Sequence, residues 1–166
     1  MQRHGPSMGE TGTKLAALAG EQETALRSLL TGLVVPHAGP ADLRAALHAL
    51  GSPAVEIVSP AQPIPLPAGT ANEITAAVRA ALDNVDQHAG DGAHAWVLLE
   101  DETDAVRITV RDDGEGIAPG RLEKARAAGR LGVAQSMCGR IADLGGATTI
   151  GEGPGGGTEV EFWVPR

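Results

Sequence analysis

The chain has 166 residues, 42% of them hydrophobic, and its 13 basic against 21 acidic residues give a formal net charge of −8. This length fits one domain, or one domain with an appended arm, and the negative charge argues against a general nucleic-acid or anionic-membrane surface. A single cysteine, Cys138, excludes an internal disulfide and suggests a reducing compartment. The sequence has no run of membrane-spanning length and no signal-peptide pattern. We therefore expect a cytoplasmic chain without direct membrane contact, although the full-length protein could be anchored in a membrane.

The first third of the chain has one clearly periodic segment. Residues 1–12 are polar and aperiodic, and we expect them to be disordered or to derive from an expression vector. Residues 13–35 carry a leucine stripe typical of an amphipathic helix. The sequence leaves open whether this arm packs on the domain or forms half of a helical dimer interface. After a linker with Pro and Gly, residues 42–50 predict a short helix and residues 55–58 a short strand.

A long helix is predicted over residues 70–89, after a proline-rich loop at 60–67. Thr70 and Glu73 have the spacing of a capping box, which predicts that the helix starts at Thr70. Apolar side chains recur along it every three or four residues and predict a buried stripe. A neighbouring face carries three residues, each four positions from the next: Ala80, Asn84 and His88.

The most informative stretch is residues 105–117, AVRITVRDDGEGI. Its alternation of apolar and polar residues predicts a strand with one buried face, which would pair with a strand at 95–100. Asp112 follows, and then Gly114 and Gly116, whose lack of a Cβ lets the backbone approach a flat ligand. A carboxylate at the end of a buried strand needs a donor, and the exocyclic amine of a purine would be one. The alternative is an ordinary acidic turn, since Asp and Gly are common in turns.

The last third combines a basic segment with a helix and two strands. Residues 117–131 have little apolar periodicity, and we expect a mobile, lid-like segment. A helix is predicted at 132–144, and strands at 147–151 and 158–164 are joined by a glycine-rich loop. Together the elements predict an α+β fold, a mostly antiparallel sheet with helices on one face. The basic segment contributes four cations: Arg121, Lys124, Arg126 and Arg130.

Four motifs follow one another along the chain: AALDNVDQHAG (80–90), DDGEG (112–116), GRLGVAQSM (129–137) and GGGTEVEFWVP (155–165). They resemble, in this order, the asparagine box, the two glycine boxes, and the closing box and strand of the ATP-binding catalytic domain of bacterial sensor histidine kinases, which belongs to the GHKL superfamily with gyrase and heat-shock-chaperone ATPases. The resemblance covers residues 40–166 and implies the two-layer α/β sandwich of Bergerat type, with the arm 13–35 resembling the end of a dimerisation helix. Together with LGG (144–146), the pattern is similar to kinases that pair with LuxR-type response regulators in actinobacteria.

The resemblance implies ATP and Mg²⁺ as cofactors and assigns a role to each matching residue. Asp112 would accept the adenine amine, and Asn84 would be the magnesium ligand, which suits the oxygen preference of this cation. Gly132 would open a helix whose free N–H groups meet phosphate, and the Thr158 hydroxyl would lie beneath the adenine. The four cations of residues 117–131 would contact phosphate. The remaining implied ATP-binding residues are Gly114, Gly116, His88 and Ser136; His88 and Ser136, the latter expected in the first turn of its helix, have equally ordinary structural interpretations.

The sequence departs from the family pattern where chemistry is concerned. Ala80 stands where the family usually has Glu as a base, and Asp83 is expected to point off that face. Gln87 stands where a basic residue is common. No phosphoacceptor box is present, because neither His4 nor His37 has the expected helical context, so the chain looks like a fragment of a longer kinase.

These observations leave three functions open. The first is a kinase domain that donates the γ-phosphoryl of ATP to a histidine on a separate dimerisation segment, with a response regulator as downstream partner. Such a domain would be inactive in isolation. The alternatives are a nucleotide-binding regulatory module without efficient turnover, and a serine kinase of the anti-sigma type. No nucleic-acid partner is expected.

Overall fold

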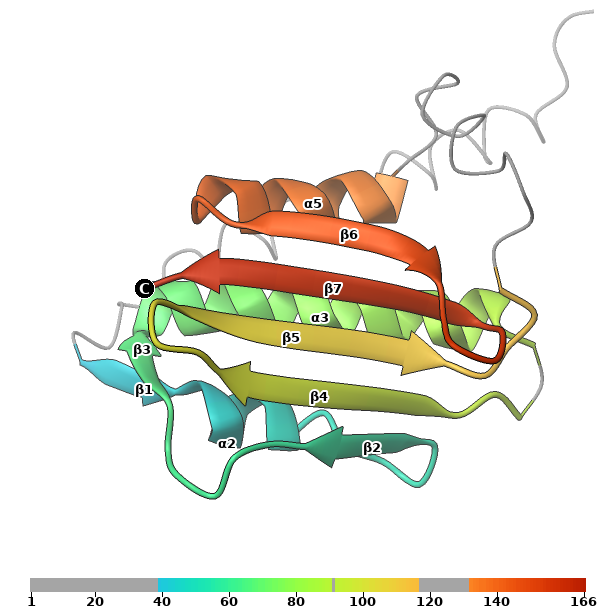
Figure 1. The fold of residues 1–166 in the computed structure, drawn as a ribbon, viewed down its shortest axis with the longest axis horizontal. Coiled ribbons are helices and arrows are strands. Elements are labelled where there is room, and N and C mark those ends of the chain that lie inside the picture. Colours follow the sequence, from blue (N-terminus) through green and yellow to red (C-terminus); the bar gives the residue numbers. More distant parts are fainter. Residues whose placement is uncertain (1–38, 91, 117–131) are drawn as a thin grey trace, which may run out of the picture. The chain divides into compact units, whose positions relative to one another are not determined.

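The computed structural model describes residues 39–90, 92–116 and 132–166 (Figure 1). The predicted arm at 13–35 and the basic segment 117–131 lie outside these residues, as do residues 1–12. None of the described helices is both long and apolar enough to cross a bilayer. The elements are β1 (Pro40–Asp42), α2 (Leu43–His48), β2 (Val55–Val58), β3 (Pro65–Pro67), α3 (Ala68–His88), β4 (Ala95–Asp101), β5 (Ala105–Asp112), α5 (Gly132–Asp143), β6 (Ala147–Glu152) and β7 (Thr158–Pro165).

The main sheet has five strands in the order β2-β4-β5-β7-β6. Only β2 and β4 run parallel, and every other neighbouring pair is antiparallel. Strand β5 lies at the centre, where its Ile108 is opposite Leu99 of β4 and Phe162 of β7. Helices α3 and α5 cover the same face of the sheet (Figure 1). The predicted α+β fold, with a mostly antiparallel sheet, is confirmed.

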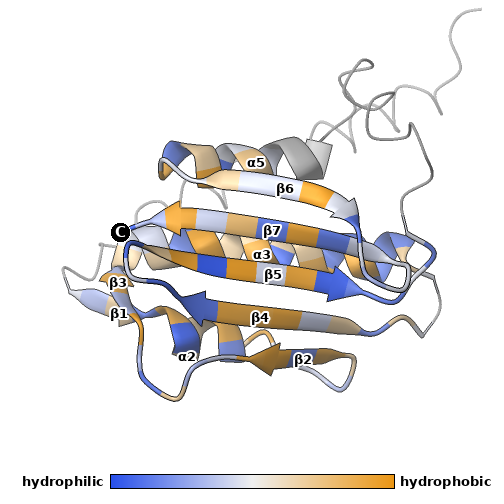
Figure 2. Cartoon of the chain, viewed as in Figure 1, coloured by the Kyte–Doolittle hydropathy of each residue, from blue (hydrophilic) through white to orange (hydrophobic). Residues whose placement is uncertain are grey.

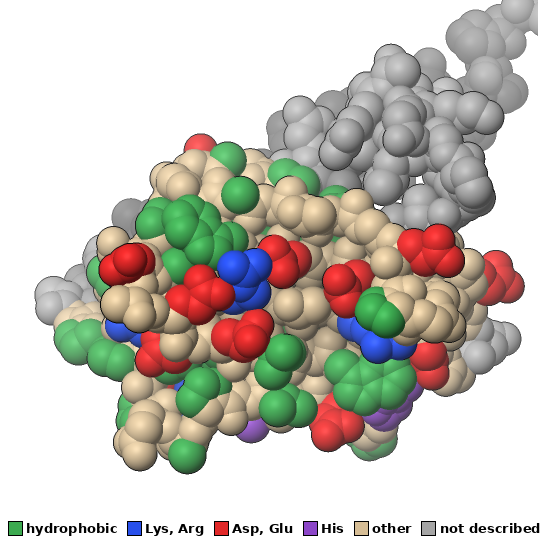
Figure 3. Space-filling view, in the orientation of Figure 1, with side chains coloured by type: hydrophobic (Ala, Val, Ile, Leu, Met, Phe, Trp, Pro, Cys, Tyr) green, Lys and Arg blue, Asp and Glu red, His purple; other side chains and the backbone are tan. Residues whose placement is uncertain are grey.

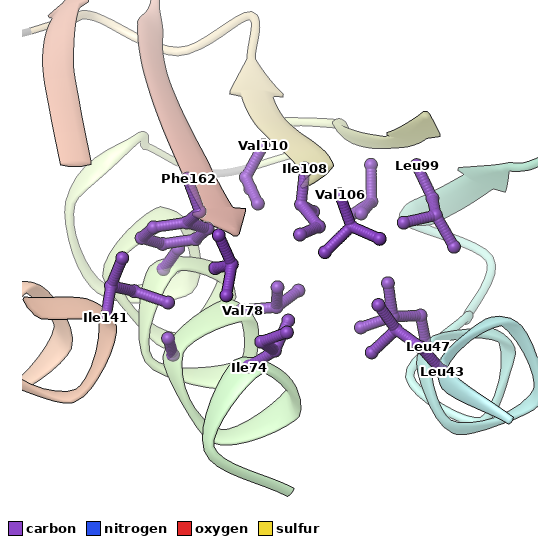
Figure 4. Packing of buried hydrophobic residues seen from close by; sticks show 14 of the residues in the cluster. Leu43, Leu47, Ile74, Val78, Leu99, Val106, Ile108, Val110, Ile141 and Phe162 are labelled. Carbon is purple, nitrogen blue, oxygen red and sulfur yellow. The ribbon is translucent and has the colours of Figure 1, made fainter. Parts of the chain in front are cut away.

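The core forms between this face of the sheet and the helices. Alternate residues of β5 are buried, and Figure 2 shows the matching alternation of hydropathy along the strand. Ile74 and Val78 of α3 point toward the sheet, while Phe162 packs near Ile141 of α5 (Figure 4). These four side chains are completely buried, as expected for a core built from aliphatic residues and the single phenylalanine.

The opposite face of the sheet carries the polar residues of the alternation, and Figure 3 shows acidic side chains gathered there with a few basic and hydrophobic ones. Arg107 of β5 donates to Glu102 and to Glu161, both at 2.7 Å. These hydrogen bonds, the one to Glu102 first, raise the pKa of the guanidinium above its ordinary value. The ion pair with Glu161 therefore ties β5 to β7 on this side, and the one with Glu102 ties β5 to the turn that precedes it.

The start of α3 differs from the prediction. The helix begins at Ala68, directly after strand β3, and no side chain caps it. Thr70 is thus the third helical residue, and the predicted capping box is wrong. The physical reason is tertiary: β3 pairs with β1, an interaction that the predicted loop and linker did not include, and this pairing places Pro67 at the entry to the helix. Glu73 instead forms an ion pair with Arg140 at 2.7 Å.

Candidate functional site

Asp112 ends the central strand β5 with its side chain toward the helices. Within the described residues it is the one charged side chain that is buried, with 3% of its surface exposed. Its Oδ1 accepts hydrogen bonds from the backbone N–H groups of Gly114, at 2.9 Å, and Thr158, at 3.1 Å. Such bonds offset the cost of removing a carboxylate from water. Both bonds reach the same oxygen, so Oδ2 is the acceptor left free by the described residues.

Glycines surround Asp112 because the backbone segments approach too closely for side chains. A Cβ on Gly157 would lie 2.0 Å from the carbonyl oxygen of Asp112, and one on Gly114 would lie 2.4 Å from the carbonyl oxygen of Ala89. Gly116 and Gly157 also have positive φ angles of +72° and +76°. The turn after β5, the loop before β7 and the end of α3 therefore meet around the carboxylate.

Sequence reasoning named Asp112, Gly114, Gly116 and Thr158, and the structure brings these four together. The sequence-based prediction did not include Gly157 among the site residues, although Gly157 belongs to the closing motif. The sequence signal that could have found it is the run of three glycines from Gly155 to Gly157. Such a run indicates a backbone that other residues rarely adopt, and in the structure each of the three has a positive φ. Thr158 reaches the cluster through its backbone amide, whereas the prediction concerned its hydroxyl.

The end of helix α3 lies beside this cluster. The N–H of Glu115 donates to the carbonyl of Ala89 at 3.2 Å, which fixes the turn against the helix end. Asn84 is half-buried, five residues before Ala89 and therefore roughly 7.5 Å away along the axis. Its side chain makes no hydrogen bond within the described residues, and His88 is exposed. No three His, Cys, Asp or Glu side chains form a metal cluster in the described part of the chain, and the Asn84 amide is the candidate ligand there.

Helix α5 begins at Gly132, as predicted. Ser136 is consequently its fifth residue and is exposed, so the expectation that it lies in the first turn is wrong. In the described residues no hydrogen bond joins Ser136 to the Asp112 cluster. The four cations Arg121, Lys124, Arg126 and Arg130 lie outside the described residues.

A hollow of about 450 Å³ lies along α3 on the side where Arg140 of α5 approaches. Ala80 and Asp83 both line it, whereas Asn84 and His88 do not. Residues three apart on a helix are neighbours on its surface, which is why Ala80 and Asp83 line the same hollow. The complete lining is Asn72, Thr75, Ala76, Arg79, Ala80, Asp83 and Arg140.

Solved structures of other proteins are similar to this chain. The histidine kinase domain from the Erythrobacter litoralis EL346 blue-light activated histidine kinase is 27% identical, with a TM-score of 0.55, over 74% of this chain and 57% of that chain. The chain spans 39% of the longer EL346 kinase. The ATP binding domain of PrrB from Mycobacterium tuberculosis is 24% identical, with a TM-score of 0.56, over 76% of this chain and 96% of that chain. The histidine kinase domain of the E. coli osmosensor EnvZ is 22% identical, with a TM-score of 0.58, over 81% of this chain and 91% of that chain.

The last two similarities establish the fold, which is that of the GHKL histidine kinase ATPases. No curated protein sequence matches the chain. The model of one protein family, described as histidine kinase-, DNA gyrase B-, and HSP90-like ATPase, matches residues 69–166. This match runs from the first turn of α3 to the end of β7 and covers more than half of the chain. The chain therefore belongs to the family of histidine kinase-, DNA gyrase B-, and HSP90-like ATPases.

Proposed function

We propose that this chain is the ATP-binding kinase domain of a two-component sensor histidine kinase, which donates the γ-phosphoryl of Mg-ATP to a histidine on a separate dimerisation segment. The observation that carries the proposal is Asp112, a buried carboxylate with one oxygen held by two backbone amides. Family membership supports an ATP site, and the 27% identity to a histidine kinase domain supports a kinase over the other ATPases of the family.

The residues around Asp112 fit an adenine nucleotide. Oδ2 is the acceptor that the exocyclic amine would use, and Gly114, Gly116 and Gly157 leave backbone rather than side chains beside it. A hydrogen bond to a charged acceptor contributes about 1.5–3 kcal/mol, which would favour adenine over a base without that amine by roughly 10- to 100-fold. Asp112 would thus set the base specificity.

The phosphate end of the nucleotide would lie toward α3 and α5. The Asn84 amide oxygen suits Mg²⁺, which keeps most of its ligands as water and phosphate. The first N–H groups of α5, from Gly132 onward, would bind phosphate together with the positive end of the helix dipole. His88 would assist, as would the cations Arg121, Lys124, Arg126 and Arg130. When bound, Mg-ATP supplies the phosphoryl group and the metal neutralises its charge, while the residues of this chain bind and orient it.

The partners we propose are the dimerisation segment of the same kinase and a response regulator. The LGG motif at 144–146 supports a regulator of the LuxR type and an actinobacterial kinase, by the resemblance described above. The structure gives this motif a role in the fold, because α5 ends there and a Cβ on Gly146 would lie 2.4 Å from the carbonyl oxygen of Trp163.

A second candidate is a nucleotide-binding regulatory module without efficient turnover. The observation in its favour is Ala80, which lines the hollow beside α3 and offers no group to accept a proton. A missing general base typically costs about 10²–10⁴ in rate. Failure of the full-length protein to label itself with radioactive ATP would favour this candidate.

Calorimetric titration tests nucleotide binding directly, with nonhydrolysable analogues of ATP and of inosine triphosphate, each with Mg²⁺. We expect the ATP analogue to bind at least about tenfold more tightly, because only adenine presents the amine to Asp112. Asp112→Asn should remove this preference while the fold is kept, since an Asn oxygen can still accept from Gly114 and Thr158. Asp113→Asn is the matched control, because Asp113 is exposed and its Oδ1 accepts from the His94 N–H at 2.7 Å. Equal affinity of wild type and Asp112→Asn would contradict the proposal.

A further inference from the structure

Arg111 occupies the face of the sheet opposite the candidate site. It directly precedes Asp112 on β5, and successive side chains of a strand point to opposite faces. Its guanidinium carbon lies 6.0 Å from the centroid of the Trp96 ring, and Trp96 in turn packs against His94 at 4.9 Å. The guanidinium also donates a hydrogen bond to the carbonyl oxygen of Pro154. Arg111 therefore connects strand β4 with the loop between β6 and β7.

The loop at residues 153–157 is held by few contacts of its own. The N–H of Gly153 donates to Gly157 at 3.2 Å, and the N–H of Gly156 donates to Gly153 at 3.1 Å. Three successive glycines with positive φ give such a loop much conformational freedom in the absence of other contacts. Arg111 packs on its outer side, because a Cβ on Gly153 would lie 3.3 Å from the Arg111 Nε, an atom that is itself buried.

The inner side of the same loop meets Asp112. A Cβ on Gly157 would lie 2.0 Å from the Asp112 carbonyl oxygen, and the N–H of Thr158 donates to Oδ1 at 3.1 Å. Two successive residues of β5 thus contact one loop from its two sides. A displacement of the loop would remove a donor from Asp112 and open the space that Gly157 fills.

We propose that Arg111 is a positioning residue for adenine recognition, holding the loop 153–157 against Asp112 from the far face of the sheet. This inference rests on the proposed nucleotide site. It predicts that loss of the Arg111 donor weakens binding chiefly for nucleotides that use Asp112, because the loop sets the orientation of that carboxylate. It also predicts that Trp96, beneath the guanidinium, responds to nucleotide even though it lies outside the site.

The test compares the affinities of four proteins for the ATP and inosine triphosphate analogues by calorimetry. Besides the wild type these are Arg111→Met, which keeps the apolar stem on Trp96 but has no donor for Pro154; Arg111→Lys, which keeps a donor; and Arg107→Met. Arg107 is the matched control because it lies on the same strand and face, yet its partners are Glu102 and Glu161 rather than the loop. Circular dichroism melts identify any variant that has lost its fold.

We expect Arg111→Met to lower the affinity for the ATP analogue about tenfold and that for the inosine analogue about twofold or less. Arg111→Lys should stay within about threefold of the wild type, since its ammonium can donate to Pro154. Arg107→Met should change neither affinity by more than about twofold, because it has no contact with the loop. Equal losses for both analogues, or the same loss in Arg107→Met, would overturn the inference in favour of a general effect on the sheet.

A spectroscopic measurement provides an independent readout. In a Trp163→Phe background Trp96 is the one tryptophan left in the chain. Its emission should change on adding the ATP analogue when Arg111 is present, and should not change in Arg111→Met. If the analogue binds but Trp96 emission does not change and Arg111→Met has no effect on affinity, the role of Arg111 is disproved while the proposed function stands. A wild type that binds no ATP analogue would disprove the proposed function itself.

Discussion

Two adjacent aspartates at the end of β5 show how one position along a strand decides what a carboxylate can do. Asp112 points into the protein and receives two backbone amides, whereas Asp113 is exposed and bonds the backbone of His94. A buried carboxylate accepts hydrogen bonds from fixed protein donors in place of water, so it can select a ligand that supplies one further donor. An exposed carboxylate remains hydrated, so a ligand must displace water to use it. In the proposed nucleotide site, Asp112 and not Asp113 would therefore select the purine amine.

The contact between Gly157 and Asp112 can be tested through a pair of neighbouring glycines. Gly157→Ala should destabilise the protein by at least about 2 kcal/mol, because Ala is strained at a φ of +76° and its Cβ would lie 2.0 Å from the Asp112 carbonyl oxygen. Gly156→Ala is the control, since its φ is +101° but no atom lies within 4 Å of the added Cβ. Urea unfolding measures both, and equal losses would show that the approach to Asp112 costs nothing beyond backbone strain.

At this scale the sequence predicts what is local and misses what is assembled by folding. Asp112, Gly114 and Gly116 lie within five residues of one another, so their spacing is visible in the chain. Gly157 comes to Asp112 from 45 positions away through the pairing of β5 with β7, which is not visible in any short pattern. The boundary at Gly132 was predicted correctly, but Ser136 is the fifth residue from it and so lies beyond the first turn of about 3.6 residues.

Among the elements, the starts of the two N-terminal helices contrast most clearly. Asp42 caps α2, and its Oδ1 accepts from the N–H of Arg44 at 3.1 Å and of Ile64 at 3.0 Å. Helix α3 has no side-chain cap and begins where β3 ends. A local Thr-x-x-Glu pattern suggested a cap at Thr70, but the pairing of β3 with β1 decides the boundary. Tertiary structure overrides the local signal here.

Two alanine variants measure this difference. Asp42→Ala should lower the free energy of unfolding by about 1–2 kcal/mol, because it leaves helix N–H groups without an acceptor and removes the bond to Ile64. Thr70→Ala should change it by less than about 0.5 kcal/mol, since Ala is at least as good as Thr inside a helix. Denaturant unfolding of both variants checks the pair. If Thr70→Ala lowered the free energy of unfolding as much as Asp42→Ala, the result would contradict this prediction and support a capping role for Thr70.

The longer strands were predicted closely, because each extends over six to eight positions. Strands β5 and β7 were expected at 105–111 and 158–164 and occur at Ala105–Asp112 and Thr158–Pro165. Strands β1 and β3 were not predicted. Each has three residues, including proline, which lacks a backbone donor, so neither has a strand signature of its own.

At the scale of the whole molecule, the two faces of the sheet differ in role. Helices α3 and α5 cover one face, and the described residues leave the opposite face, the open face, without a helix on it. The covered face holds the core and ends in the Asp112 cluster, while the open face carries ion pairs and the Arg111 contact to the glycine loop. A binding site at the end of such a sheet can recognise a nucleotide without any partner. Transfer of its phosphoryl group is a different matter, because the acceptor must also be brought into place.

The last prediction follows from this separation: the chain binds Mg-ATP, yet labels itself and hydrolyses ATP slowly when alone. No stretch of the 166 residues resembles the phosphoacceptor box, and Ala80 cannot take a proton from an attacking water. An acceptor must stand at near-attack distance, and a misplacement of about 1 Å can cost on the order of 100-fold in rate. An added acceptor helix should nevertheless restore transfer, because the attacking histidine nitrogen carries its own lone pair.

Radiolabelled ATP would be incubated with this chain alone, and then with the separately produced dimerisation segment of the same kinase. We expect acid-labile label on the added segment at a rate at least about tenfold above that of the lone chain. The same segment with its acceptor histidine changed to alanine is the control, since it keeps the docking surface and removes the nucleophile. Strong labelling of the lone chain would contradict the prediction and would direct attention to His4, His37 and Ser136. Acid-stable label would instead point to a serine kinase, because phosphohistidine is lost in acid whereas phosphoserine persists.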